Sequence, residues 1–377
     1  MWDNTGKLLL KGIEEEGYTG TREGDAVGMS HEIAADLQGF ATEPDCRNAE
    51  FATRPVHAYE ALGHALHSNR RRLRGYLQQR GDYTLLPGAS LTLGNAKVFM
   101  RSNPNNPYHT YIEEQYGPNV VTASEHINIG IAGHEKLIRA YRVIRAEAAV
   151  FLALSAASPF LDGKVTGYHS YRWHVFPKTP STVPFFRNHA HYVEWVEAQL
   201  ASGAMQNIRH LWLSARPNGI RAPQEIQRLE LRVCDRVDSL MELMAIIAFA
   251  EARVHEVLAD ATLDPLRNGL RDDATLMQWT AANEEACSMH SLDAEVVRWD
   301  SGQKIQVRDW VGEMLSSARH TARELEFESY LGPLDDLLTN GNAAMRWLRL
   351  HADGVTIPDI FKAAIAETDK NEKEIVF

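Results

Sequence analysis

Three stretches of β-forming residues in this chain place charged or polar side chains at alternating positions. These stretches span residues 8–16, 120–131 and 229–235. Because strand side chains alternate between faces, residues two apart share a face. The pairs brought together in this way are Glu14 with Glu16, His126 with Asn128, and Glu230 with Arg232. Crowded carboxylates repel each other unless cations neutralise them, and hard ions such as Mg²⁺ take oxygen ligands and bridge carboxylates to nucleotide phosphates.

The residues between the charged positions lie on the other face of each strand and determine what that face can pack against. Leu229, Leu231 and Val233 form an apolar face opposite Glu230 and Arg232. The pattern indicates a sheet with one apolar face and one wet, acidic face. Two simpler readings stay open. A charged alternate face commonly just meets solvent, and an exposed Glu–Arg pair contributes little. His126 could equally be a hydrogen-bonded core histidine.

Further polar and aromatic blocks follow in a characteristic order. They span residues 42–53, 83–88, 106–113, 155–163, 166–172, 189–191, 205–212 and 216–219. Taken in this order, the chain resembles the carboxylate–amine ligases of the glutamate–cysteine ligase type 2 group, and most of all the cyanobacterial-type branch. The resemblance runs from about Leu8 to about Leu350, and it rests on the order and spacing of the blocks together.

The resemblance implies an α+β fold. A largely antiparallel sheet curls into a saddle or partial barrel, helices cover its outer face, and the concave face holds the active site, as in the related catalytic fold of glutamine synthetases. No composition break divides the chain. We therefore expect one catalytic domain over residues 1–355, followed by a C-terminal helix and charged tail over 356–377.

The resemblance also implies a reaction. The γ-carboxylate of L-glutamate attacks the γ-phosphate of ATP, and an amine, with cysteine favoured, then displaces phosphate from the γ-glutamyl phosphate. The product would be γ-glutamylcysteine, the first step of glutathione-type thiol synthesis. Phosphoryl transfer of this kind needs positioning and charge neutralisation more than covalent protein chemistry, and metal ions held by carboxylates supply part of both.

Site residues follow from the same resemblance. Mg²⁺, or Mn²⁺ in its place, is expected on an acidic wall to which the strand histidine also belongs. The residues of this wall are Glu14, Glu16, Glu43, Glu50, His126 and Glu230. Arg172 and Arg232 are expected on phosphate or substrate carboxylate, because a guanidinium fork matches either group. Asn128, on the face of His126, is placed beside the nucleotide.

Several positions depart from the branch's pattern. Glu15 and Glu125 stand where it has apolar residues, Gly17 replaces a bulky residue, and the segment 186–189 also differs. Alternation points Glu15 and Glu125 away from the metal face, toward Lys, Arg or water. Because a few side chains decide small-substrate choice, these departures bear chiefly on the acceptor amine.

Two rival functions remain open at this point. One is the same chemistry with an amine other than cysteine. The other is a catalytically silent paralogue that binds ATP or a small acid, against which the complete acidic set and Arg232 argue. A metal-dependent hydrolase is disfavoured because nothing resembles an open zinc triad.

Composition sets outer bounds on function. The formal net charge of −11 over 377 residues argues against nucleic acid as a partner, since phosphate backbones select basic surfaces. Cys46, Cys234 and Cys287 stand far apart, which is typical of a reducing compartment. With no secretory signal and no stretch of membrane-spanning length, the cytoplasm is expected, and a homo-oligomer is left open.

Periodicity predicts the remaining elements. Strands are expected at 7–16, 47–54 and 119–131, with a strand or loop at 83–100. Helices are expected at 30–38, 57–80, 134–157, 188–202, 238–259, 274–289, 306–325 and 333–351. The basic run 69–74 is interpreted as a solvated helix face, and the charged run 368–374 as a frayed tail. Trp212 is assigned to the core.

Overall fold

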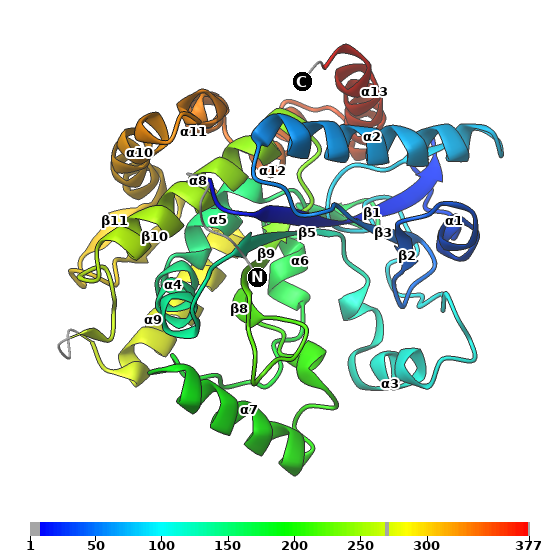
Figure 1. The fold of residues 1–377 in the computed structure, drawn as a ribbon. Coiled ribbons are helices and arrows are strands. Elements are labelled where there is room, and N and C mark those ends of the chain that lie inside the picture. The colour runs from blue at the N-terminus through cyan, green and yellow to red at the C-terminus, as the bar shows by residue number, and fades with distance from the viewer. Residues whose placement is uncertain (1–7, 268–270, 376–377) are drawn as a thin grey trace.

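A seven-stranded antiparallel sheet lies at the centre of the computed structural model, which describes residues 8–267 and 271–375 (Figure 1). The strands run in the order β2-β3-β1-β5-β9-β8, and β4 also pairs with β1. Their bounds are β1 Lys11–Thr21, β2 Phe40–Thr42, β3 Asn48–Ala52, β4 Tyr83–Leu85, β5 Ser124–Gly130, β8 Ala215–Asn218 and β9 Arg228–Asp235. Two small hairpins lie apart from this sheet, β6 Phe160–Leu161 with β7 Lys164–Val165, and β10 Glu295–Val297 with β11 Lys304–Gln306. The predicted α+β fold with an antiparallel sheet is confirmed.

Strand register explains how residues distant in sequence meet. Glu14 lies directly opposite His126, and Glu16 lies opposite Glu50. Directly opposed residues of an antiparallel pair project to the same face. The strand alternation and this register together place the expected acidic residues on one surface of the sheet.

Helices surround the sheet. Their bounds are α1 Ser30–Asp36, α2 Tyr59–Gln78, α3 Pro107–Tyr116, α4 His134–Ala146, α5 Ala148–Ser155, α6 Tyr171–Val175, α7 His189–Ser202, α8 Leu240–Ala259, α9 Asp273–His290, α10 Val307–Glu324, α11 Pro333–Asn340, α12 Ala343–Ala352 and α13 Ile357–Glu374. Short 3₁₀ turns are η1 Gly117–Val120, η2 Ile208–His210, η4 Ser291–Asp293 and η5 Glu328–Leu331. In Figure 1, α2 lies on one side of the sheet beside β1, with α13 beyond it, whereas α3 lies on the other side.

Two predicted long helices are broken in the structure. The first breaks at Glu147, which is buried and accepts hydrogen bonds from Arg253 and Trp299. The second breaks at Gly341, whose φ of 81° ends α11, while the Asn342 side chain caps α12. Left-handed glycine and an Asn cap are ordinary stop and start signals.

Two interpretations of charged runs are wrong. Residues 368–374 are helical rather than frayed, and Glu372 is buried against Arg74. The basic run 69–74 is solvated only in part, because Arg70 and Arg74 are buried. These two residues are one helical turn apart, so they share the inward side of α2. Of the span 83–100, residues 83–85 form a strand.

The described residues contain no helix that is both long enough and apolar enough to cross a membrane. The longest helices, α2 and α8, instead bury arginine and glutamate side chains, among them Arg70 and Glu251.

Candidate active site

The acidic face of the sheet borders a hollow of about 860 Å³. Carboxylates of β1 and β3 and the polar residues of β5 and β9 form one side of it. Residues of α3 and α6 and residues within 208–212 also line it. The predicted site residues that line the hollow are Glu14, Glu16, Glu43, Glu50, His126, Arg172 and Arg232. Glu230 and Asn128 are not part of this lining, but both contact residues that are.

Three side chains come together as a candidate metal centre. Within the described ranges, Glu14, His126 and Glu230 offer ligand atoms that all lie within 4.8 Å of one another. Nδ1 of His126 is 3.5 Å from a Glu14 oxygen and 4.0 Å from a Glu230 oxygen. Despite the opposing effect of burial, the His126 and Arg232 partners lower the pKa of Glu14.

Hydrogen bonds orient the His126 ring. The Ser124 hydroxyl donates to Glu16 at 2.6 Å and lies 3.0 Å from Nε2 of His126. A hydroxyl has one proton, so Nε2 must be the donor toward Ser124. In the neutral ring, Nδ1 would then keep its lone pair, and it lies 3.3 Å from the guanidinium of Arg232. A neutral imidazole nitrogen in this state is the form that binds metal.

Arginines surround Glu230, whose side chain is fully buried. Arg216 approaches both of its oxygens, at 2.9 and 3.0 Å, and Arg232 bonds one of them. Burial opposes ionisation, but these two cations hold the pKa of Glu230 well below its usual range. Glu230 is therefore a permanent carboxylate that also fixes the direction of Arg232.

Among the residues that the structure describes, no arginine bonds the side chains of the other three carboxylates of the wall, Glu16, Glu43 and Glu50. Burial and the Glu16 and Glu50 carboxylates raise the pKa of Glu43 well above its usual range. Burial and Glu16 likewise raise the pKa of Glu50. Like charges in one enclosed site resist ionising together.

This donor set fits a divalent cation. Carboxylate oxygens of Glu14 on β1 and Glu230 on β9 lie close to an imidazole nitrogen of His126. The raised pKa values of the neighbouring Glu43 and Glu50 indicate repulsion that a bound cation would relieve. Glu14, His126 and Glu230 would hold one such ion, and Glu16, Glu43 and Glu50 supply the neighbouring carboxylates.

Arg172 and Asn128 are placed less simply than expected. Arg172 is buried on α6, and its terminal nitrogens donate to the backbone carbonyls of Arg232 and Val233. Its Nε has no partner in the described structure. Asn128 donates to Glu14 and accepts from Arg228. Contacts of Arg172 and Asn128 with substrate therefore stay predictions.

Sequence reasoning gave no individual role in the site to several side chains that lie there. Arg216 and Asn218 on β8 both bond Glu230, and Arg228 on β9 lies 3.8 Å from Glu14. A usable signal existed for Arg228, because residues 228, 230 and 232 alternate onto one face of the same strand. No local signal pairs Arg216 with Glu230, since that contact depends on strand register.

Aromatic side chains, which we call the aromatic wall, also line the hollow. Tyr108, Phe176 and Trp212 line it, and the Phe176 and Trp212 ring centroids are 5.3 Å apart. Trp212 is buried, as expected, yet it also borders the hollow. Nearby, the exposed guanidinium of Arg209 lines the same space without a hydrogen-bond or ion-pair partner among the described residues.

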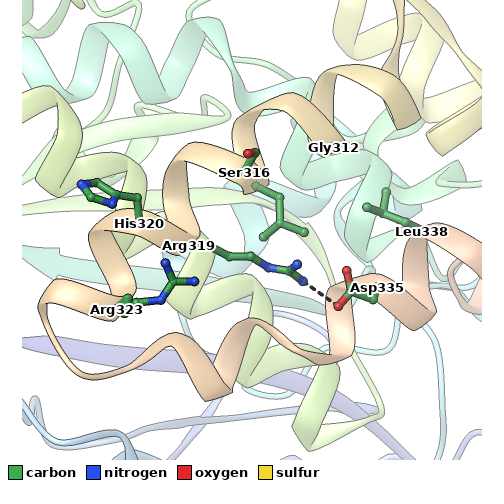
Figure 2. Close-up of a pocket in the computed structure, with 8 residues that line it drawn as sticks. Gly312, Ser316, Arg319, His320, Arg323, Asp335 and Leu338 are labelled. Carbon is green, nitrogen blue, oxygen red and sulfur yellow. Dashed lines mark hydrogen bonds and ion pairs between the residues drawn. The ribbon is translucent and has the colours of Figure 1, made fainter.

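A second hollow, shown in Figure 2, lies between α10 and α11. Its arginines are already paired, Arg319 with Asp335 and Arg323 with Glu328. No predicted site residue lines it. The chemistry expected from the sequence is therefore concentrated on the sheet.

Comparisons with known proteins point to one family. A sequence model of glutamate–cysteine ligase family 2 matches residues 10–365. A provisionally named glutamate–cysteine ligase 2-1 of Rubrobacter xylanophilus is 26% identical over 374 residues, covering 97% of this chain and 91% of its own length. A similarly named protein of Sorangium cellulosum is 26% identical over 230 residues, 60% of this chain and 58% of its own.

Solved structures share the fold. A glutamate–cysteine ligase of Francisella tularensis in complex with AMP superposes with a TM-score of 0.73 at 12% identity, covering 98% of this chain and 89% of that chain. A bifunctional glutathione synthetase of Pasteurella multocida gives a TM-score of 0.75 at 15% identity, with 98% of this chain matched to 53% of that one. At these identities the likeness establishes the fold.

Proposed function

The chain belongs to glutamate–cysteine ligase family 2, and we propose that it uses ATP to join the γ-carboxyl group of L-glutamate to an amine. L-cysteine is the favoured acceptor, which would make γ-glutamylcysteine, as in the cyanobacterial-type branch. The observation that carries this proposal is the convergence of Glu14, His126 and Glu230 beside the Arg232 fork in one hollow.

The reaction proceeds in two displacements. A γ-carboxylate oxygen of glutamate attacks the γ-phosphorus of ATP, and the bond to the ADP oxygen breaks. The acceptor nitrogen then attacks the acyl carbon, phosphate leaves with the bonding electrons, and the amine loses a proton. Both steps move negative charge between oxygens, so fixed cations stabilise them more than any covalent protein group could.

Each side chain has a definite task in this scheme. Glu14, His126 and Glu230 would hold Mg²⁺, or Mn²⁺ in its place, and the bound ion would neutralise triphosphate oxygens. Arg232, oriented by Glu230, presents its fork to phosphate or to the substrate carboxylate. Ser124 fixes the tautomer of His126.

The aromatic wall favours a second candidate within the same chemistry. Tyr108, Phe176 and Trp212 offer apolar surface beside the partnerless Arg209. An α-amino acid larger than cysteine could use both features, because aromatic faces bind apolar groups and a guanidinium binds carboxylate. This alternative keeps glutamate activation and changes the acceptor alone.

The cellular setting is proposed on the cysteines. Cys46 is half-buried, Cys234 and Cys287 are buried, and all three are free thiols. Free thiols fit a reducing compartment such as the cytoplasm. A homo-oligomer stays a prediction.

Phosphate release tests the proposal. Purified protein is incubated with ATP, Mg²⁺ and L-glutamate, with and without L-cysteine, and the product is identified by mass. Cysteine-dependent release with γ-glutamylcysteine supports the first candidate. Glutamate-dependent release without a cysteine effect directs the search to other amines, and absence of release with every amine tried contradicts the ligase assignment.

A further inference from the structure

The face of the sheet away from the hollow carries a second set of buried charges. We call it the ionic layer, made up of Glu15, Arg70, Glu125 and Arg236. All four residues are at most 1% exposed. Glu15 and Glu125 lie directly opposite each other on β1 and β5. They alternate with Glu14, Glu16 and His126 along the same two strands.

Arg70 of α2 is the centre of this layer. Its Nε approaches both oxygens of Glu15, at 2.8 and 2.9 Å, and one terminal nitrogen lies 3.3 Å from Glu125. The terminal nitrogens also donate to the backbone carbonyls of Val237 and Asp238, at 2.7 and 2.6 Å. One side chain thus joins β1, β5 and the segment that follows β9.

The ionic layer lies beneath an irregularity of the sheet. The pairing of β5 with β9 shifts register between Glu125 and Ile127, so His126 has no regular partner on β9. This register places two residues of β9, Arg232 and Val233, opposite His126, so the extra residue lies on β9. A bulge of this kind re-aims the side chains beside it. Glu125, adjacent to His126 in the chain and bonded by Arg70, lies at one end of this bulge.

Stability alone does not explain so costly an arrangement. Burying four ionisable groups carries a large desolvation cost, and apolar replacements of similar size are often as stable or more so. Unlike apolar packing, an ion cluster has a defined geometry, because each guanidinium fixes the distance between the carboxylates that it bonds.

We propose that Arg70 is a positioning residue for the candidate metal centre. By bonding Glu15 and Glu125 together, it sets the distance between the Glu14 carboxylate on β1 and the His126 ring on β5. The proposal rests on the metal-binding part of the proposed function and does not depend on which amine is the acceptor.

The chain offers a matched control in Arg74. It lies one turn further along α2, is buried, and bonds both oxygens of Glu372 on α13. Its described partners include no carboxylate of β1 or β5. Replacing either arginine therefore breaks a buried ion pair of the same helix, but only Arg70 bonds the strands of the metal centre.

Mn²⁺ binding, measured by electron paramagnetic resonance without substrates, tests the proposal. The proteins compared are the wild type, Arg70→Met and Arg74→Met, each also assessed by thermal unfolding. We expect Arg70→Met to weaken Mn²⁺ binding about tenfold or more, the range seen when groups supporting metal ligands are removed. Arg74→Met should bind Mn²⁺ within about twofold of the wild type while losing comparable stability.

A second variant keeps the test decisive if Arg70→Met does not fold. Arg70→Lys keeps the charge but cannot reach both strands as a fork, so it should still weaken Mn²⁺ binding more than Arg74→Met. Equal binding by Arg70→Lys and the wild type would overturn the positioning role and leave the proposed function standing. Absence of Mn²⁺ binding by the folded wild type would instead contradict the metal centre itself.

Discussion

The two faces of the central sheet differ in how the carboxylates on them are neutralised. On the hollow side, Glu16, Glu43 and Glu50 lie together, and the pKa values of Glu43 and Glu50 are raised by burial and by neighbouring carboxylates. Among the described residues, arginines on the hollow side bond Glu230 but not Glu43 or Glu50. On the opposite side Arg70 and Arg236 bond Glu15, and Arg70 also bonds Glu125, whose pKa is raised by burial and by Glu15.

The difference separates carboxylates placed to bind a cation from carboxylates that support the fold and, through Arg70, the proposed metal centre. A carboxylate whose cation comes from the chain contributes to the fold, because the pair forms when the protein folds. A carboxylate without one is a standing electrostatic cost that a bound cation can remove. Substitutions on the hollow side should therefore affect turnover most, and those on the opposite side should affect stability most.

The largest expected effect is at Glu14. Glu14→Gln removes the negative charge of a predicted metal ligand on the hollow side. Turnover should fall by at least about 10²–10³-fold, the loss seen when one group that stabilises developing charge is removed. The unfolding midpoint should stay near that of the wild type. Phosphate release and a thermal scan measure both, and near-normal turnover would remove Glu14 from the acidic wall.

Arg232→Lys should come next. A single ammonium cannot reproduce a fork that Glu230 orients beside His126. We expect turnover to fall by about 10²-fold, as for misplaced catalytic groups. Steady-state kinetics with ATP and glutamate varied separately check this, and a change below threefold would make Arg232 structural.

Glu15→Gln probes the opposite face. The substitution removes the buried negative charge that Arg70 and Arg236 bond, which should lower the free energy of unfolding by about 3–5 kcal/mol. Urea denaturation measures the loss. At a temperature where the variant is folded, its turnover should exceed that of Glu14→Gln; the reverse order would contradict the division between the faces.

Glu43→Gln should stabilise the metal-free protein. Burial and the carboxylates of Glu16 and Glu50 raise the folded-state pKa of Glu43 well above its usual 4.5. The folded protein favours the protonated form of Glu43, so this residue lowers the free energy of unfolding as the pH rises from 4.5 toward its raised folded-state pKa. At neutral pH the amide avoids this loss, and the melting temperature should rise by a few degrees.

The pH dependence supplies the control for Glu43→Gln. Near pH 4.5, where the carboxyl of the wild type is protonated in the folded protein, the two melting temperatures should converge. Saturating Mg²⁺ should also stabilise the wild type more than the variant. A variant less stable than the wild type at neutral pH would contradict the inference that carboxylate repulsion in the acidic wall destabilises the metal-free protein.

Cys46→Ser is expected to change least. Cys46 is a half-buried free thiol, and burial together with Asp45 raises its pKa. The thiol form is a poor nucleophile, so turnover should stay within about twofold, well inside the range of surface changes. Loss of activity would point to thiol chemistry in place of the acidic wall.

Much of the site could be predicted from local pattern. Alternation on each strand placed Glu14 with Glu16, and the resemblance to a known family joined the segments to one another. The same alternation correctly placed Glu15 and Glu125 on the other face. It could not name their partners, and it misread the basic run of α2 as solvated, because nothing local distinguishes a buried Arg70 from the exposed Arg71.

What the sequence by itself determined is therefore which residues share a face: strand and helix geometry repeat every few residues, and side-chain direction follows from that repeat. What only the tertiary structure decided is which faces meet. Strand register pairs Arg216 with Glu230, and helix packing brings Arg70 beneath Glu15 and Glu125. Such contacts join residues far apart in the chain, and they depend on the simultaneous packing of several elements, which no short window of sequence encodes.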